Sequence, residues 1–223
     1  MNGILNRIDN SFKFLVMGRR FSSLGYIKGY SKFEYIQKRV IDYTMVTLFI
    51  SFLWPVILYT IYRIKKESSG DILFKQSRVG LDGKTFTCYK FRSMHTDSHF
   101  DPYTKDNDTR IFPYGKIMRK LRIDELAQLI NVIKGDMHIV GPRAEWDILV
   151  HEYEKVIIDY RSRHKVRPGI TGLAQTKYPY GRNAYDARRK LGYDLLYIKK
   201  WSIFLEFSVL FETVLVVLKK RGV

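Results

Sequence analysis

The chain has 223 residues, of which 46% are hydrophobic, and its 39 Lys and Arg against 22 Asp and Glu give a formal net charge of +17. This length predicts one core with attachments and excludes two independent large domains. The single cysteine, Cys88, excludes an intrachain disulfide framework and a multi-cysteine zinc site. The positive charge favours anionic partners such as lipid headgroups, nucleotides or nucleic acid, without choosing among them.

Residues 1–37 mix apolar and basic side chains, including Phe12, Phe14, Arg19 and Arg20. This pattern predicts an amphipathic leader that lies on a membrane surface. A partly disordered leader fits equally well, so both interpretations stay open.

The stretch from Tyr43 to Tyr62 contains no charged residue, and its length is about the 20 residues that a helix needs to cross a bilayer core. Pro55 removes a helix hydrogen bond in its middle. Basic residues flank both ends, namely Lys38, Arg39, Arg63, Lys65 and Lys66. Because basic flanks favour the cytoplasmic side, residues 38–66 predict a re-entrant helix kinked at Pro55, in preference to a straight span.

Residues 67–223 are expected to form a cytosolic domain. Turn residues at 68–71 and 80–83 surround two short runs with strand character and predict a small β-hairpin over residues 67–94. The polar residues 95–110 predict a mobile loop suited to act as a lid.

Apolar spacing predicts helices over residues 114–133, 147–162 and 183–201. Residues 167–172, with the sequence RPGITG, predict a tight loop between the last two. Residues 201–218 are apolar but include Glu206 and Glu212, which favours an interfacial or packed helix over a second span. The expected fold class is therefore α+β and mainly helical.

Adjacent carboxylates at Asp124 and Glu125 are the first candidates for chemistry. Neighbouring residues of a helix point about 100° apart, so one carboxylate can attack while the other holds a cation. An Asp carboxylate can form an acyl phosphate, and Mg²⁺ beside it would neutralise phosphate oxygens. A solvated charged surface is the ordinary alternative.

Cations beside turns form a second candidate group. Arg143 follows Gly141-Pro142, and Arg167 precedes Pro168-Gly169. Such arginines offer rigid forks for phosphate, although a purely structural turn explains the same pattern. Lys90 and Arg92 add positive charge, and the scattered histidines predict no metal site.

Taken in chain order, these motifs resemble the bacterial sugar transferases, which are monotopic phosphoglycosyl transferases. The matching segments are Lys38-Arg39 with Asp42, QSRVG at 76–80, KFRSM at 90–94, DELAQLIN at 124–131, GDM at 135–137, VGPR at 140–143 and PGITG at 168–172.

The resemblance implies a re-entrant helix kinked at Pro55 and a nucleophile at Asp124, with Glu125 holding Mg²⁺. The implied substrate-binding and phosphate-binding residues are Arg119, Arg143, Lys90, Arg92, Arg167, Gln175 and Arg182. Three positions depart from the family pattern: Trp54 where Ser is frequent, Ala144 where Pro is usual, and Arg167 where Lys is common.

The implied reaction moves a hexose 1-phosphate from a UDP-sugar to undecaprenyl phosphate and releases UMP, as the first membrane step of polysaccharide or glycoconjugate synthesis. Residues 178–181 resemble members that transfer glucose or galactose. The implied location is the bacterial inner membrane, with the catalytic domain facing the cytoplasm, membrane lipids as partners, no nucleic acid, and a homodimer left open.

Two alternatives remain. The chain could be a basic, membrane-anchored binding or scaffold protein without catalysis, whose binding would weaken steeply with salt. It could also transfer the sugar phosphate directly, without a covalent intermediate, and sequential kinetics would identify that case.

Overall fold

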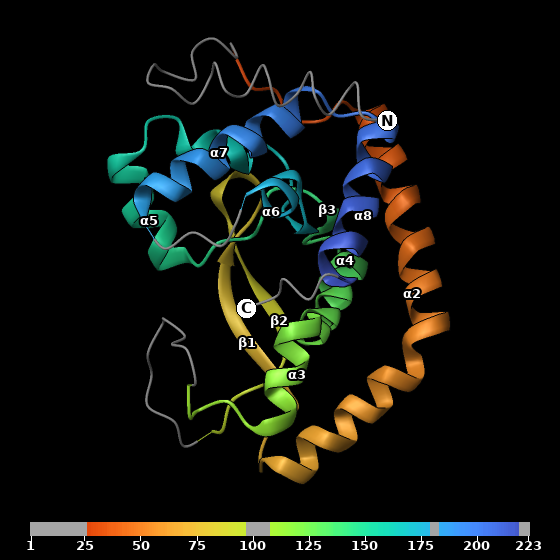
Figure 1. Cartoon of the computed structure of the whole chain (residues 1–223). Coiled ribbons are helices and arrows are strands. Elements are labelled where there is room, and N and C mark those ends of the chain that lie inside the picture. The colour runs from red at the N-terminus through yellow and green to blue at the C-terminus, as the bar shows by residue number, and fades with distance from the viewer. Residues whose placement is uncertain (1–25, 97–107, 179–182, 219–223) are drawn as a thin grey trace.

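The computed structural model describes residues 26–96, 108–178 and 183–218, and Figure 1 shows the arrangement. The α-helices are α2 (Lys32–Glu67), α3 (Pro113–Leu121), α4 (Leu129–Lys134), α5 (Asp147–Val156), α6 (Leu173–Lys177), α7 (Ala184–Lys199) and α8 (Ile203–Leu218). The strands are β1 (Leu73–Val79), β2 (Thr85–Phe91), β3 (His138–Val140) and β4 (Gly169–Thr171), and three 3₁₀ segments are η2 (Leu81–Gly83), η3 (Ile123–Gln128) and η4 (Tyr160–Lys165). The expected mainly helical class with a small hairpin is confirmed.

Helix α2 begins six residues before the predicted re-entrant segment, because Ser31 and Glu34 form a capping box at its N-terminus. The helix continues through Pro55 to Glu67, and its ribbon bends partway along (Figure 1). Residues 1–25 of the expected leader lie outside the described residues.

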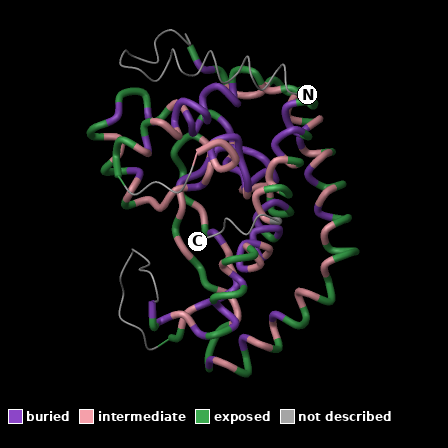
Figure 2. Tube along the Cα trace, viewed as in Figure 1, coloured by how far each residue is buried: buried purple, intermediate pink, exposed green. Residues whose placement is uncertain are grey.

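Both ends of α2 are buried against the rest of the chain, while its middle only touches the cores through partly exposed side chains such as Phe49 and Ile57. Its buried residues are Lys38, Asp42 and Val46 toward one end and Thr60 and Ile64 toward the other. None of the residues 47–59 is buried, and Figure 2 shows exposed and half-buried positions along most of the helix. Among the described residues, α2 is the one helix that is long and apolar enough to cross a membrane.

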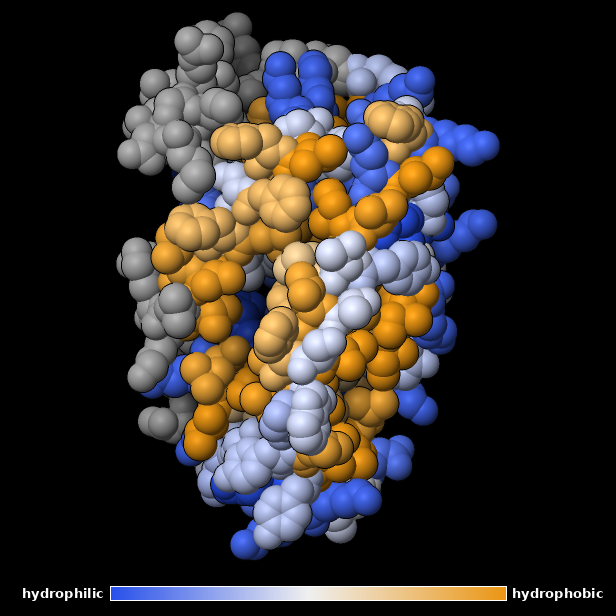
Figure 3. Space-filling view, turned by 90° about the vertical axis from the view of Figure 1, so that its right-hand side faces the viewer, coloured by the Kyte–Doolittle hydropathy of each residue, from blue (hydrophilic) through white to orange (hydrophobic). Residues whose placement is uncertain are grey.

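The face that includes α2 exposes many apolar side chains, as Figure 3 shows. Those with substantial exposure include Leu48, Ile50, Phe52, Trp54 and Leu58 on α2, and Phe204, Phe207, Phe211 and Val214 on α8. An exposed apolar surface of this extent is rare on soluble proteins and marks a site that binds another protein or a membrane. It is therefore consistent with association with a membrane.

The β-hairpin is formed by β1 and β2, which pair antiparallel with Leu73 opposite Phe91 and Val79 opposite Thr85. The turn at Leu81–Gly83 includes Gly83 at φ +79°, a conformation that glycine adopts without steric cost. The predicted hairpin is thus confirmed, and part of the expected loop after it, residues 97–107, lies outside the described residues.

The loop predicted over residues 167–172 contains a strand instead. β4 pairs parallel with β3, and the two approach so closely that a Cβ on Gly169 would lie 2.0 Å from the amide nitrogen of Gly141. The Gly and Pro residues of this segment suggested a loop. The strand was missed because its parallel partner is distant in the chain and leaves no local pattern in the sequence.

The single helix predicted over residues 114–133 is also wrong, because it divides into α3, η3 and α4. Arg122 ends α3 in the left-handed region, at φ 56° and ψ 25°. A non-glycine residue in this conformation costs free energy and is most often retained at functional sites. The break places Asp124 and Glu125 on a 3₁₀ segment, where successive residues point about 120° apart.

The helix predicted over residues 147–162 ends early, at Val156, and a separate 3₁₀ segment follows from Tyr160. The helix predicted from Asn183 is confirmed: the Asn183 side chain accepts a hydrogen bond from the Asp186 amide and caps α7. Helix α7 contributes most of its length to the main core, which also includes β3, β4 and part of α8. A smaller core packs the end of α2 against β2 and α3.

Candidate active site

Asp124 and Glu125 lie on η3 between the two cores. Ala127 of the same segment packs in the smaller core, and Leu129, which follows it, packs in the main one. Both carboxylates are buried, with exposed fractions of 9% and 7%. Because a buried carboxylate needs compensating partners, the surrounding charges decide what each one can do.

Three cations surround Glu125. Its carboxylate lies 3.0 Å from Arg143, 3.3 Å from Lys90 and 3.6 Å from Arg122. Burial alone would raise the pKa of Glu125, but these cations, Arg143 foremost, hold that pKa well below its usual range. Glu125 is therefore a fixed anion at the centre of the site.

Asp124 differs from its neighbour. Within the described part of the chain its carboxylate accepts no hydrogen bond and forms no ion pair. Burial raises the pKa of Asp124, and the negative charge of Glu125 adds to this, although Lys90, Arg119 and Arg143 oppose it. A buried carboxylate without a bonded partner is suited to act as a nucleophile once it is ionised.

Asn131 fixes the strand that carries Lys90. Its fully buried side chain accepts a hydrogen bond from the Tyr89 amide at 3.0 Å and donates one to the Thr87 carbonyl at 2.7 Å. These two bonds align β2 with α4, the helix that follows the dyad of Asp124 and Glu125. The Lys90 side chain consequently extends toward Glu125.

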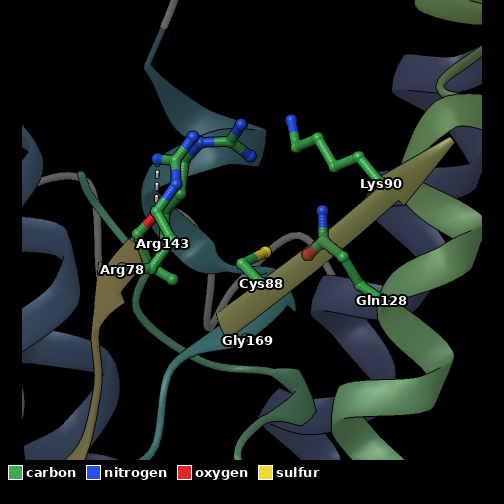
Figure 4. Close-up of a pocket in the computed structure, with 7 residues that line it drawn as sticks. Arg78, Cys88, Lys90, Gln128, Arg143 and Gly169 are labelled. Carbon is green, nitrogen blue, oxygen red and sulfur yellow. Dashed lines mark hydrogen bonds between the residues drawn. The ribbon is translucent and has the colours of Figure 1, made fainter. Parts of the chain in front are cut away.

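A small pocket lies beside the dyad, shown in Figure 4. Its lining residues are Arg78, Cys88, Lys90, Gln128, Arg143, Ala144 and Gly169. In the view of Figure 4, the amino group of Lys90 and the guanidinium of Arg143 project to the same side of β2. Three cationic side chains converge on this pocket, so it is suited to bind an anion such as a phosphate group.

The structure brings together four of the predicted site residues, namely Asp124, Glu125, Lys90 and Arg143. Arg119 is close enough to Asp124 to influence it electrostatically, and its Nε donates to the Ser93 hydroxyl at 2.9 Å.

Three other predicted residues bond to backbone carbonyls. Arg92 donates to Ser68 and Ser69 at the end of α2, Arg167 donates to Gly135, and Gln175 donates to Ile170. Arg167 also lies over the ring of Tyr35. Arg182 lies outside the described residues.

Arg78, Gln128 and Arg122 were not predicted as site residues. Arg78 belongs to the QSRVG motif, which the sequence alone did not connect with the dyad. Its position in the pocket results from the pairing of β1 with β2 and from a hydrogen bond of 3.0 Å to the Ala144 carbonyl. A residue so far from the dyad in the chain carries no local signal of its role.

The donor set fits Mg²⁺ only together with a substrate. No group of three or more His, Cys, Asp or Glu suited to a metal ion occurs within the described ranges. In phosphate chemistry, Mg²⁺ is commonly held by one or two carboxylates plus the phosphate oxygens of the substrate. Asp124 and Glu125 supply such carboxylates, and Glu125 remains the expected protein ligand.

Comparison with known proteins gives consistent matches. Residues 33–220 match the family model described as bacterial sugar transferase. The chain is 42% identical over 187 residues to a UDP-N-acetylgalactosamine-undecaprenyl-phosphate N-acetylgalactosaminephosphotransferase of Aeromonas hydrophila, covering 83% of this chain and 44% of that protein. It is 38% identical over 181 residues to a UDP-glucose:undecaprenyl-phosphate glucose-1-phosphate transferase of Klebsiella pneumoniae, covering 79% of this chain and 39% of that protein.

A shorter relative matches over most of its length. The uncharacterized sugar transferase EpsL of Bacillus subtilis is 39% identical over 189 residues, which is 84% of this chain and 90% of that protein. The chain thus spans less than half of the Aeromonas and Klebsiella proteins, whose names state a reaction, and nearly all of one whose name states none.

Proposed function

The chain belongs to the bacterial sugar transferase family, and from this premise we propose that it transfers a hexose 1-phosphate from a UDP-sugar to undecaprenyl phosphate through a covalent intermediate on Asp124. The observation that carries this proposal is the contrast within the dyad. Glu125 is held by three cations, whereas Asp124 is buried beside it without a bonded partner.

In the first half-reaction, a carboxylate oxygen of Asp124 attacks the β-phosphorus of the UDP-sugar. The bond from this phosphorus to the oxygen that bridges the two phosphates breaks, and UMP leaves with that oxygen. The sugar phosphate remains on Asp124 as an acyl phosphate.

The cationic pocket accounts for the charge in this step. Lys90 and Arg143 lie at the pocket and also contact Glu125, so they are placed to bind phosphate oxygens next to the nucleophile. Mg²⁺, when bound with the substrate and Glu125, would neutralise further negative charge on the phosphates.

In the second half-reaction, a phosphate oxygen of undecaprenyl phosphate attacks the same phosphorus. The acyl phosphate bond breaks, and Asp124 is regenerated as a carboxylate. The product is an undecaprenyl diphosphate sugar. Two displacements at one phosphorus predict ping-pong kinetics.

We also propose that α2 enters and leaves the cytoplasmic leaflet, so that the catalytic domain faces the cytoplasm of a bacterial inner membrane. Both ends of α2 pack against the domain that carries the dyad. Lys38 and Asp42 make the contacts at one end, and Thr60 and Ile64 make them at the other. The exposed apolar residues of α2 between these ends would lie in lipid.

The test measures UMP release from UDP-glucose, UDP-galactose and UDP-N-acetylgalactosamine by the full chain in detergent, with and without Mg²⁺ and undecaprenyl phosphate. Asp124→Asn is compared with Asp82→Asn, a matched change at an exposed carboxylate on the hairpin turn. We expect the wild type and Asp82→Asn to release UMP, and Asp124→Asn to release none. When the donor carries a label on its sugar, we also expect a labelled sugar phosphate to be attached to the wild type and to Asp82→Asn, but not to Asp124→Asn.

Normal turnover by Asp124→Asn would contradict the nucleophile assignment. Release that occurs only when donor and lipid are bound together, with sequential kinetics, would favour direct transfer. No release with any donor, from folded protein, would favour the non-catalytic binding protein.

A further inference from the structure

The segment that carries Arg143 is fixed at four consecutive carbonyl groups by four separate donors. Its carbonyls accept hydrogen bonds as follows: Pro142 from the Gly169 amide at 2.9 Å, Arg143 from Arg163 at 2.8 Å, Ala144 from Arg78 at 3.0 Å and Glu145 from the Val79 amide at 3.1 Å. Four bonds in succession leave this backbone little freedom. The long side chain of Arg143 therefore starts from a fixed point.

The donor to the Arg143 carbonyl is itself a buried charge. Arg163 is 4% exposed, and it lies on η4, outside the pocket. Its Nη2 also lies 2.8 Å from a carboxylate oxygen of Asp194 on α7, and its Nη1 donates to the Tyr160 hydroxyl at 2.7 Å. Removing two charges from water costs free energy that an uncharged donor would avoid.

The position of this ion pair indicates more than a contribution to packing. Arg163 acts on the backbone of the residue whose guanidinium lies 3.0 Å from Glu125 and lines the pocket. A displacement of about 1 Å in a substrate-positioning group can reduce a rate by about 100-fold. Fixing the Arg143 backbone therefore matters directly for phosphate binding.

We propose that Arg163, with Asp194 as its counter-ion, is a positioning residue that sets the place of Arg143 for the donor phosphates. The proposal rests on the proposed function. Arg163 touches no substrate in this scheme, and its effect passes through Arg143.

The test compares Arg163→Lys with Arg161→Lys in the full chain, using kcat/KM for the UDP-sugar. The two positions lie on the same 3₁₀ segment, but the Arg161 side chain is 81% exposed. A lysine keeps the charge at position 163, yet its single ammonium cannot reproduce the fork to the Arg143 carbonyl, Tyr160 and Asp194. We expect Arg163→Lys to lower kcat/KM about tenfold or more, and Arg161→Lys to change it by no more than about twofold.

A double-mutant cycle separates positioning from general stability. In an Arg143→Ala background, Arg163→Lys should lower kcat/KM by no more than about twofold further, because the group that it positions is absent. If Arg163 is merely structural, Arg163→Lys will lower kcat/KM by the same factor in the Arg143→Ala background as in the wild type. That result would overturn the proposal.

Asp194→Asn is a second variant in case Arg163→Lys does not fold. Asn keeps the size of the side chain but removes the negative charge that lies 2.8 Å from Arg163, while the charge of Glu145 stays. We therefore expect a loss in the same direction, again absent in the Arg143→Ala background. An active wild type whose kcat/KM is unaffected by these variants would overturn this proposal alone. A wild type inactive with every donor would overturn the proposed function, and this proposal with it.

Discussion

The ammonium of Lys38 on α2 lies 2.7 Å from a carboxylate oxygen of Glu206 on α8, and neither side chain has any exposed surface. The same ammonium donates to the Val140 carbonyl at 2.9 Å and to the Tyr197 hydroxyl at 2.8 Å. All three donors of the ammonium are therefore used. The pair joins the apolar helix to the strand that leads to Arg143.

Breaking this pair should destabilise the protein strongly. Glu206→Gln would leave the Lys38 ammonium buried without a counter-charge, which costs on the order of 3–5 kcal/mol. Replacing both residues, as Lys38→Met with Glu206→Leu, should restore much of that stability because no unpaired charge remains. Denaturant unfolding in detergent, followed by tryptophan fluorescence, measures the change.

The control for this experiment is Glu152→Gln, which removes one partner of the exposed ion pair between Lys155 and Glu152. Its unfolding midpoint should stay at the wild-type value. An unfolding midpoint of Glu206→Gln equal to that of the wild type would show that the buried pair contributes no stability.

The pH dependence of activity should report the charge state of Asp124. Burial and Glu125 raise the pKa of Asp124, so kcat/KM should fall, as pH is lowered, at a pH above the ordinary Asp value of about 3.9. Lys90 opposes this rise. Lys90→Met should therefore raise the pKa further and move the acid limb to higher pH by about one unit, besides lowering the maximal rate.

Lys84→Met is the matched control, because Lys84 is exposed at the hairpin turn and should leave the acid limb in place. The profile is measured as kcat/KM for the nucleotide sugar at constant ionic strength. An acid limb that stays fixed or moves to lower pH in Lys90→Met would contradict the proposed charge coupling.

Pro55, which lies inside α2, should decide the topology of this helix. In a Cys88→Ser background, Lys32→Cys and Ser69→Cys place single thiols at exposed positions beside the two ends of the helix. We expect a membrane-impermeant maleimide to label both thiols in inverted vesicles and neither from the periplasmic side. Pro55→Leu restores the missing helix hydrogen bond and should allow a fraction of molecules to span, which exposes one thiol to the periplasm.

Phe52→Leu, an apolar change at an exposed position of the same segment, should leave the labelling pattern unchanged. Labelling of one thiol from the periplasmic side in the unaltered helix would mean that α2 spans the membrane and would rule out the re-entrant arrangement.

Elements with strong local signals were predicted from the sequence. The hairpin followed from two short runs around Gly80 and Gly83, and α7 followed from its apolar spacing. The cap at Asn183 was recognised only in the structure. The break at Arg122 was missed because the apolar spacing of residues 114–133 continues across it. A single left-handed residue ends the helix without changing that spacing.

The site divides in the same way. The chemical types of Asp124, Glu125, Lys90 and Arg143 identified them as candidates, and the structure brings these four together. Arg92 and Arg167 have the same chemistry, yet they bond to backbone carbonyls. Residue type alone does not distinguish an arginine that supports a chain segment from one that faces a pocket.

The sequence by itself determined the apolar helix, the hairpin and the identity of the dyad, because each depends on residues close together in the chain. Only the tertiary structure decided which cations surround Glu125, that Arg78 lines the pocket, and that Arg163 and Lys38 hold the segment leading to Arg143. These contacts join residues far apart in the chain. Their geometry is fixed by how the strands and helices pack, and no local pattern encodes it.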